Sequence, residues 1–141
     1  MNKGGYNMIF TYDEIRQGAI PTKEQEKNGL EIIRRVNLLA ELIEKRCGIK
    51  LPAVPLVRWL RSEMQNEAVG GVKNSPHLTG EAIDIKDPNF IISQYILNNV
   101  DLLKEVGLYM ENPYFCVSKA TGNTWIHLQI RKASMHIFKP Y

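Results

Sequence analysis

The sequence has few cysteines: Cys47 and Cys116 are the two that occur in its 141 residues. Two thiols so far apart cannot form a disulfide framework, and they are too few for a cysteine-based zinc site. Free cysteines are most often buried, and we expect both to be core thiols. A chain of this length can bury a core without disulfide bonds, so we interpret residues 1–141 as a single domain.

Long apolar segments are also missing. No stretch of the sequence approaches the roughly 18 apolar residues of a transmembrane helix, so we expect no membrane insertion. The N-terminal residues lack the apolar core of a signal peptide. We therefore expect synthesis in the cytoplasm without a signal peptide, and a target beyond the membrane would require another factor to release the protein.

Charge of one sign is not in large excess. Lys and Arg number 18 against 15 Asp and Glu, which gives a formal net charge of +3. The basic residues are scattered along the chain, whereas nucleic-acid-binding domains cluster them on one face or helix. We therefore expect no nucleic-acid partner.

Helix signals are concentrated in the first two thirds of the chain. Capping boxes at residues 11–14 and 22–25 each predict a helix start. The second opens a long helix that Gly48 ends, and its apolar stripe has spacings of three and four: Ile33, Val36, Ala40, Ile43 and Cys47. Shorter helices are predicted over residues 62–69 and 87–99, the second with Pro88 at its first position.

Strand signals are found mainly after Gly107. The stretch "VPLVRW" (54–59) predicts one buried strand, and four short segments predict others: 108–110, 114–118, 123–130 and 134–139. Helices followed by strands favour an α+β domain with a small antiparallel β-sheet.

Two histidines and an aspartate are candidate metal ligands. His77 precedes Gly80, where the chain can turn tightly, and Asp84 follows in a strand-like segment. His127 lies in a second such segment, where alternation puts Trp125 and Gln129 on its face. Histidine and aspartate suit a zinc site. The spacing alone also fits a strand-end carboxylate and a surface histidine. The third histidine, His136, is expected to be structural or exposed to solvent.

A longer pattern around these residues resembles a known family. The motif Ser-x-His-x-x-Gly-x-Ala-x-Asp is complete in Ser75, His77, Gly80, Ala82 and Asp84, and a Trp-x-His motif follows at Trp125 and His127. Both are similar to motifs of the zinc D-alanyl-D-alanine carboxypeptidases, a family that includes phage cell-wall endopeptidases and shares its fold with hedgehog domains. The resemblance implies that His77, Asp84 and His127 bind Zn²⁺, and that helices pack on one side of the sheet.

The same resemblance implies a role for Arg61. The family pattern Ser-Gly-Tyr-Arg-Ser, followed by Asn-x-x-Val-Gly-Gly, corresponds here to "VRWLRS" and "NEAVGG", with Trp59 and Leu60 replacing Gly and Tyr. A guanidinium suits either a peptide carboxylate or a developing oxyanion. A surface salt bridge is the alternative role for Arg61, and Arg58 is its nearest competitor.

The general base departs from the family pattern. Many relatives carry a carboxylate three residues before the last histidine, and others carry one two residues after it. The corresponding residues here are Thr124 and Gln129, and neither can usefully accept a proton from water. Glu111 is our candidate base, because its segment leads towards that of His127. An ordinary exposed or turn-capping glutamate is the alternative.

The resemblance implies a zinc metallopeptidase that hydrolyses a peptide bond of the peptidoglycan stem, as a carboxypeptidase or an endolysin-type endopeptidase. The alternative is a zinc-binding pseudoenzyme that binds cell-wall peptide, or serves a structural role, without hydrolysis. A protein that shares only the fold is a further alternative. A phage-encoded enzyme released to the cell wall, or one carried in a virion, fits the expected absence of a signal peptide.

Overall fold

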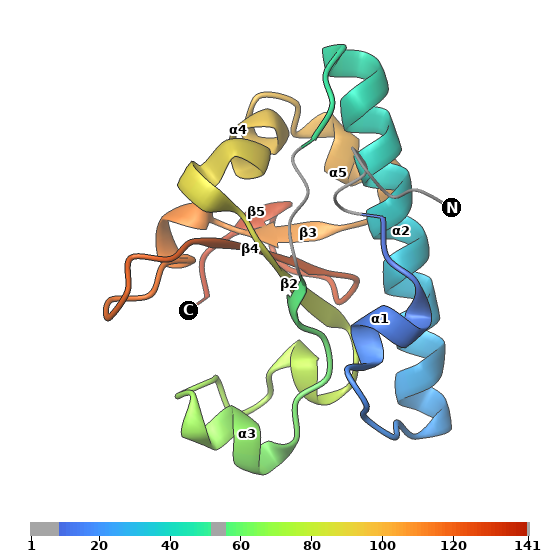
Figure 1. Cartoon of the computed structure of the whole chain (residues 1–141), viewed down its shortest axis with the longest axis vertical. Helices are drawn as coiled ribbons and strands as arrows, with labels where there is room; N and C mark the ends of the chain where they lie inside the picture. The colour runs from blue at the N-terminus through green and yellow to red at the C-terminus, as the bar shows by residue number, and fades with distance from the viewer. Residues whose placement is uncertain (1–8, 52–55, 141) are drawn as a thin grey trace.

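One long helix supports a five-stranded sheet (Figure 1). The computed structural model describes residues 9–51 and 56–140. The helices are α1 (Tyr12–Arg16), α2 (Lys23–Cys47), α3 (Glu63–Ala68), α4 (Ile91–Leu97) and α5 (Asp101–Val106). The strands are β1 (Leu56–Arg58), β2 (Ala82–Lys86), β3 (Tyr109–Glu111), β4 (Trp125–Gln129) and β5 (Ile137–Phe138). The α+β fold class predicted from the sequence is therefore confirmed.

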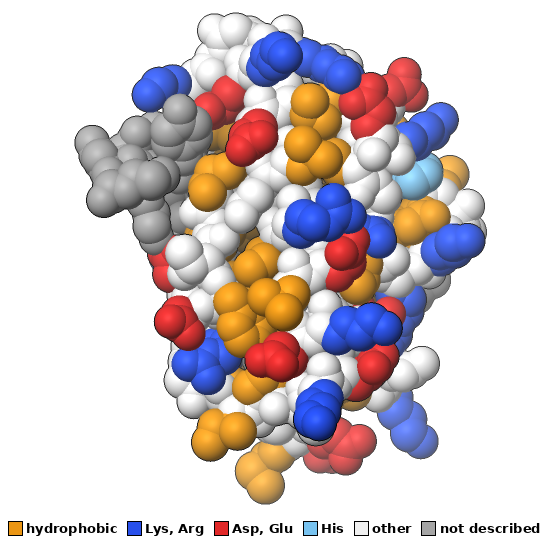
Figure 2. Space-filling model, turned by 90° about the vertical axis from the view of Figure 1, so that its right-hand side faces the viewer, with side chains coloured by type: hydrophobic (Ala, Val, Ile, Leu, Met, Phe, Trp, Pro, Cys, Tyr) orange, Lys and Arg blue, Asp and Glu red, His pale blue; other side chains and the backbone are white. Residues whose placement is uncertain are grey.

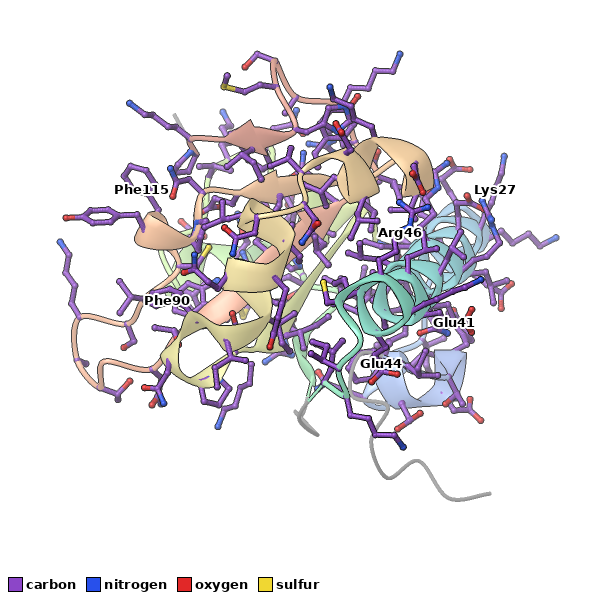
Figure 3. All side chains as sticks on the ribbon, turned by 90° about the horizontal axis from the view of Figure 1, so that it is seen from above. Lys27, Glu41, Glu44, Arg46, Phe90 and Phe115 are labelled. Carbon is purple, nitrogen blue, oxygen red and sulfur yellow. The ribbon has the colours of Figure 1, made fainter. Side chains whose placement is uncertain are left out.

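Helix α2 follows its sequence signals. Thr22 and Gln25 form the predicted capping box, and Gly48 ends the helix in a left-handed conformation. The apolar stripe of α2 packs into the core with residues of α4, α5 and the inner face of the sheet. Its outer side interleaves positive and negative side chains (Figure 2). Lys27 and Glu41 point outwards from α2, whereas Arg46 forms an ion pair with Glu105 of α5 at 2.8 Å (Figure 3).

The sheet order is β1-β2-β4-β3-β5. The first three pairings are antiparallel, as predicted, but β5 pairs with β3 in parallel. The sheet is therefore mixed. Both edges of β4 are already occupied by β2 and β3, so the chain after β4 continues to the free edge of β3. There the Met110 N–H donates to the His136 carbonyl at 2.7 Å.

The helices that contribute to the core lie on one side of the sheet, as the resemblance implied, and they include α1, α2, α4 and α5. Helix α3, at the lower end of Figure 1, is separate from α4 and α5 and adds no residue to this core. The other face of the sheet is left for polar side chains. In the described part of the chain, no helix is long and apolar enough to cross a membrane.

Several predicted elements differ from the structure. The helix predicted over 87–99 begins only at Ile91, because Asn89 and Phe90 have positive φ and the Asp87 carboxylate caps α4 from within the core. Helix α5 was not predicted. The strand predicted over 114–118 is wrong: a 3-10 turn over Pro113–Phe115 is found there. Part of the strand predicted over 54–59 lies outside the described residues.

Trp59 connects α2 to the segment that carries His77 and Gly80. The indole is fully buried, and its N–H donates to the Gly80 carbonyl at 2.8 Å. A Cβ atom at Gly29 would lie 2.4 Å from the Trp59 ring, so α2 needs a glycine at this point. Gly80 has a φ of +78°, and a Cβ atom at this position would lie 3.0 Å from the same ring. These two glycines therefore fix the position of Trp59.

We expect Gly29→Ala to destabilise the protein by about 1–3 kcal/mol, since the added methyl overpacks the Trp59 ring. Helix propensity alone predicts the opposite sign, because alanine is favoured over glycine by about 1 kcal/mol within a helix. Urea unfolding measures the change. Lys27→Ala, on the exposed side of the same helix, is the control and should stay close to wild type. A Gly29→Ala variant as stable as wild type would contradict this packing.

Candidate metal centre

Strands β2 and β4 bring Asp84 and His127 together. The two residues are direct partners in the antiparallel register. Because side chains alternate along a strand, they share the face of the sheet opposite the core, while Ile83 and Ile85 point into the core. Both polar side chains are nevertheless buried, with 7% of each residue exposed.

His77 reaches the same point from a loop. It lies in a 3-10 turn over Pro76–Leu78, whose start is capped by the Ser75 hydroxyl. The ring Nδ1 lies 2.7 Å from the Trp59 carbonyl oxygen. A carbonyl can only accept, so Nδ1 must carry the proton of this hydrogen bond. The Nε2 atom of His77 is therefore the nitrogen that faces the site.

The three side chains form one compact group. Asp84 Oδ2 lies 3.1 Å from His77 Nε2, and Asp84 Oδ1 lies 2.9 Å from His127 Nδ1. One ligand atom from each residue can be chosen so that all three atoms lie within 4.8 Å of one another. The structure thus brings together the three residues that the sequence suggested as ligands.

The donor set fits a metal ion. His77 Nε2 is buried and has no hydrogen-bond partner, even though a carboxylate oxygen lies close to it. With the proton on Nδ1, a neutral His77 presents a lone pair towards that oxygen, and two lone pairs repel unless a cation or proton lies between them. Two histidines, one carboxylate and an open cavity beside them match the ligand types of a catalytic zinc site.

The electrostatics keep Asp84 ionised. Burial raises the pKa of Asp84, but the neighbouring His77 and the hydrogen bond with His127 outweigh it, so the pKa lies well below its usual value. Burial lowers the pKa of His127, but the hydrogen bond to Asp84 and the charge of Asp84 raise it by more. The pKa of His127 therefore lies above its usual value. A carboxylate ligand has to be ionised, and this environment favours that form.

The family comparison agrees with this geometry. A model of the family described as Peptidase M15 matches residues 6–118. The chain belongs to the peptidase M15 family. This confirms the resemblance seen in the sequence, and M15 peptidases are zinc-dependent enzymes. The match includes His77 and Asp84, whereas His127 lies beyond it and is assigned to the group by the register of β2 and β4. A search of curated proteins found no match.

Arg61 lies beside this M15 ligand group. Its Nη2 is 3.8 Å from Asp84 Oδ2, and its Nη1 donates to Asn66 Oδ1 at 2.7 Å. A Cβ atom at Gly71 would collide with both Asn66 and Arg61. The "NEAVGG" segment thus supplies the amide that orients the guanidinium and the glycine that makes room for it. The sequence pattern marked Asn66, but its contact with Arg61 is visible only in the structure.

A cavity of about 680 Å³ opens beside the group. Glu111 lines it, and the β3–β4 register, which pairs Met110 with Leu128, brings Glu111 next to His127. Burial raises the pKa of Glu111, and the proximity of His127 only partly offsets this effect. Among the described residues, Asp84 and Glu111 are the acidic residues that line this cavity.

Other residues considered from the sequence have different surroundings. Thr124 donates its hydroxyl to the Asp87 carbonyl, and Gln129 lines the cavity and contacts His127. His136 is outside the ligand group, where it stacks on Tyr109 with ring centroids 4.4 Å apart. Of the two cysteines, Cys116 is buried as expected, whereas Cys47 is only partly buried.

We expect the purified, untagged protein to bind about one zinc ion per chain. His77→Ala and Asp84→Ala should each abolish this binding, because each removes one of three ligands. Elemental analysis after dialysis measures the metal content. His136→Ala is the matched control and should keep its zinc. Retention of a full equivalent of zinc by both ligand variants would exclude this metal centre.

Proposed function

We propose that the protein is a zinc-dependent peptidase that hydrolyses a peptide bond of the peptidoglycan stem. The observation that carries the proposal is the position of Glu111 and Arg61, which line the same cavity as His77, Asp84 and His127 in a member of the M15 family. A general base, a cation and a metal-ligand group in one cavity are the parts that metal-assisted amide hydrolysis requires.

Each residue has a defined task in this proposal. His77, Asp84 and His127 would hold Zn²⁺, which supplies a Lewis acid for the scissile carbonyl and lowers the pKa of water. Glu111 accepts the proton of the attacking water and returns it to the leaving amine. Burial raises the pKa of Glu111, and a higher pKa makes the carboxylate a stronger base. Arg61, oriented by Asn66, donates to the oxygen that becomes negative in the transition state.

The charge of the cavity supports an anionic substrate. Four cationic residues line it: Arg58, Arg61, Arg131 and Lys139. Arg131 is paired with Glu81 at 2.8 Å, but the side chain of Arg58 makes no hydrogen bond or ion pair with another described residue. Arg58 is the register partner of Asp84, so its side chain shares the face of the ligand group. We propose that Arg58 binds a free carboxylate of the stem peptide.

A zinc-binding pseudoenzyme is the second candidate. The observation that favours it is the absence of a carboxylate at Thr124 and Gln129, where relatives carry one. In that case the cavity binds the stem peptide through Arg58 and Arg61, and Glu111 has no role as a base. Zinc-loaded protein would then bind stem peptides without releasing any product.

We expect Glu111→Gln to keep zinc and fold while losing about 10²–10⁴-fold in turnover, the contribution of a positioned general base. Mass spectrometry of a synthetic stem pentapeptide and of digested peptidoglycan measures the products. Glu41→Gln, on the outer side of α2, is the control. An active wild type that is indifferent to Glu111→Gln would defeat the role of Glu111. An inactive wild type with a full zinc site would select the pseudoenzyme.

Arg61→Lys should also retain zinc, but it should lose about 10²–10³-fold in kcat, as expected for an oxyanion donor. Lysine keeps the positive charge and loses the forked geometry that Asn66 orients. Single-turnover kinetics on the stem peptide measure the loss. An unchanged kcat would exclude Arg61 as an oxyanion donor and leave it a structural role.

Arg58→Ala should raise KM about 10-fold or more for a peptide with a free carboxylate, since a hydrogen bond to a charged group is worth about 1.5–3 kcal/mol. The same peptide with that carboxylate amidated should show no difference between variant and wild type. Lys27→Ala, far from the cavity, serves as the control for lost charge. An equal change with both peptides would exclude carboxylate recognition by Arg58.

A further inference from the structure

Gln129 is held at both ends of its side-chain amide. Its Nε2 donates to the Arg131 carbonyl at 2.9 Å, and its Oε1 lies 2.7 Å from His127 Nε2. The residue is buried, with 5% exposed. A carbonyl cannot donate, so the contact with Arg131 requires the NH₂ group on that side. The orientation of the amide is therefore determined, and its oxygen faces His127.

This orientation places one proton of the His127 ring on Nε2. Because Gln129 Oε1 can only accept, the hydrogen bond between them requires a proton on His127 Nε2. Nδ1 lies 2.9 Å from Asp84 Oδ1, which also can only accept, so both nitrogens carry a proton when no metal is bound. A metal ion bound beside Asp84 would replace the Nδ1 proton, and the Nε2 proton would stay on the hydrogen bond to Gln129. His77 has the opposite arrangement, with its Nδ1 proton donated to the Trp59 carbonyl and its Nε2 facing the site.

We propose that Gln129 is the positioning residue of the metal centre: it fixes His127 as the Nε2–H tautomer and thereby makes Nδ1 the ligand atom. This inference rests on the proposed zinc site and deepens it. The two histidines would then bind through different nitrogens, Nε2 of His77 and Nδ1 of His127. Partners of this kind set the tautomer and ring orientation of histidine ligands in many metal sites.

The neutral amide also affects the charge of the centre. A carboxylate next to His127 would add a second negative charge to that of Asp84, whereas Gln129 accepts the same hydrogen bond without one. The ligands and their direct partners then carry one negative charge, so a bound Zn²⁺ retains a net charge of +1. Gln129, at a position where some relatives carry a carboxylate, thus keeps the charge of the metal centre higher, and this effect does not depend on which residue is the general base.

The test uses the full chain loaded with zinc, or with ¹¹³Cd as a spectroscopic substitute, and with ¹⁵N-labelled histidine. In wild type we expect a protonated Nε2 on His127 and a metal-coupled Nδ1. Gln129→Met keeps the length of the side chain but has no amide oxygen, and it should bind zinc about 10–100-fold more weakly. Gln129→Glu restores an acceptor oxygen and should regain most of that affinity. Gln94→Met, on the exposed side of α4, is the matched control.

Three results would overturn the proposal. One is a metal bound through Nε2 of His127 in wild type, which needs no variant and applies even if Gln129→Met does not fold. Another is wild-type zinc affinity in a folded Gln129→Met. The last is a failure of Gln129→Glu to bind better than Gln129→Met. If wild type binds no metal, the proposed function fails separately. The ¹⁵N spectrum of the metal-free protein at neutral pH then still shows whether Nε2 of His127 carries a proton beside Gln129, and an unprotonated Nε2 would overturn the proposal.

Discussion

The buried carboxylate of Asp84 is the interaction on which the site depends. An isolated ionised group inside a protein is strongly unfavourable, so it requires opposite charge and hydrogen bonds around it. Asp84 has His77 on one oxygen and His127 on the other, with Arg61 slightly farther away. The same arrangement presents two imidazole nitrogens and a carboxylate to one point. A buried ionic group of this kind contributes little net stability, which favours a role in binding a cation.

The rest of the fold fixes the atoms of this group. The pairing of β2 with β4 places Asp84 opposite His127. Trp59 holds His77 through its backbone carbonyl, and the indole is in turn fixed against α2 at Gly29. Gln129 holds the outer nitrogen of His127. Each histidine thus has its remote nitrogen bonded to a fixed oxygen, which leaves the other nitrogen for the metal.

Much of this arrangement could be predicted from local sequence. The capping box at Thr22 and the apolar stripe define α2, and the spacing around His77 and Asp84 marks two of the ligands. The parallel pairing of β5 and the start of α4 could not be predicted, because they depend on which strand edges are free and on the buried cap at Asp87. The role of Gln129 required the directions of two hydrogen bonds. Glu111 remains a predicted base, although its position beside His127 agrees with that role.

The central claim is that His77, Asp84 and His127 form a catalytic type of zinc site in this M15 peptidase. Diffraction at the zinc absorption edge from crystals of the zinc-loaded protein tests it most directly. We predict one anomalous peak at about 2.0–2.1 Å from His77 Nε2 and from His127 Nδ1, with an Asp84 oxygen at about 2.0–2.2 Å. A peak at other residues, or none in crystals grown with excess zinc, would contradict the account.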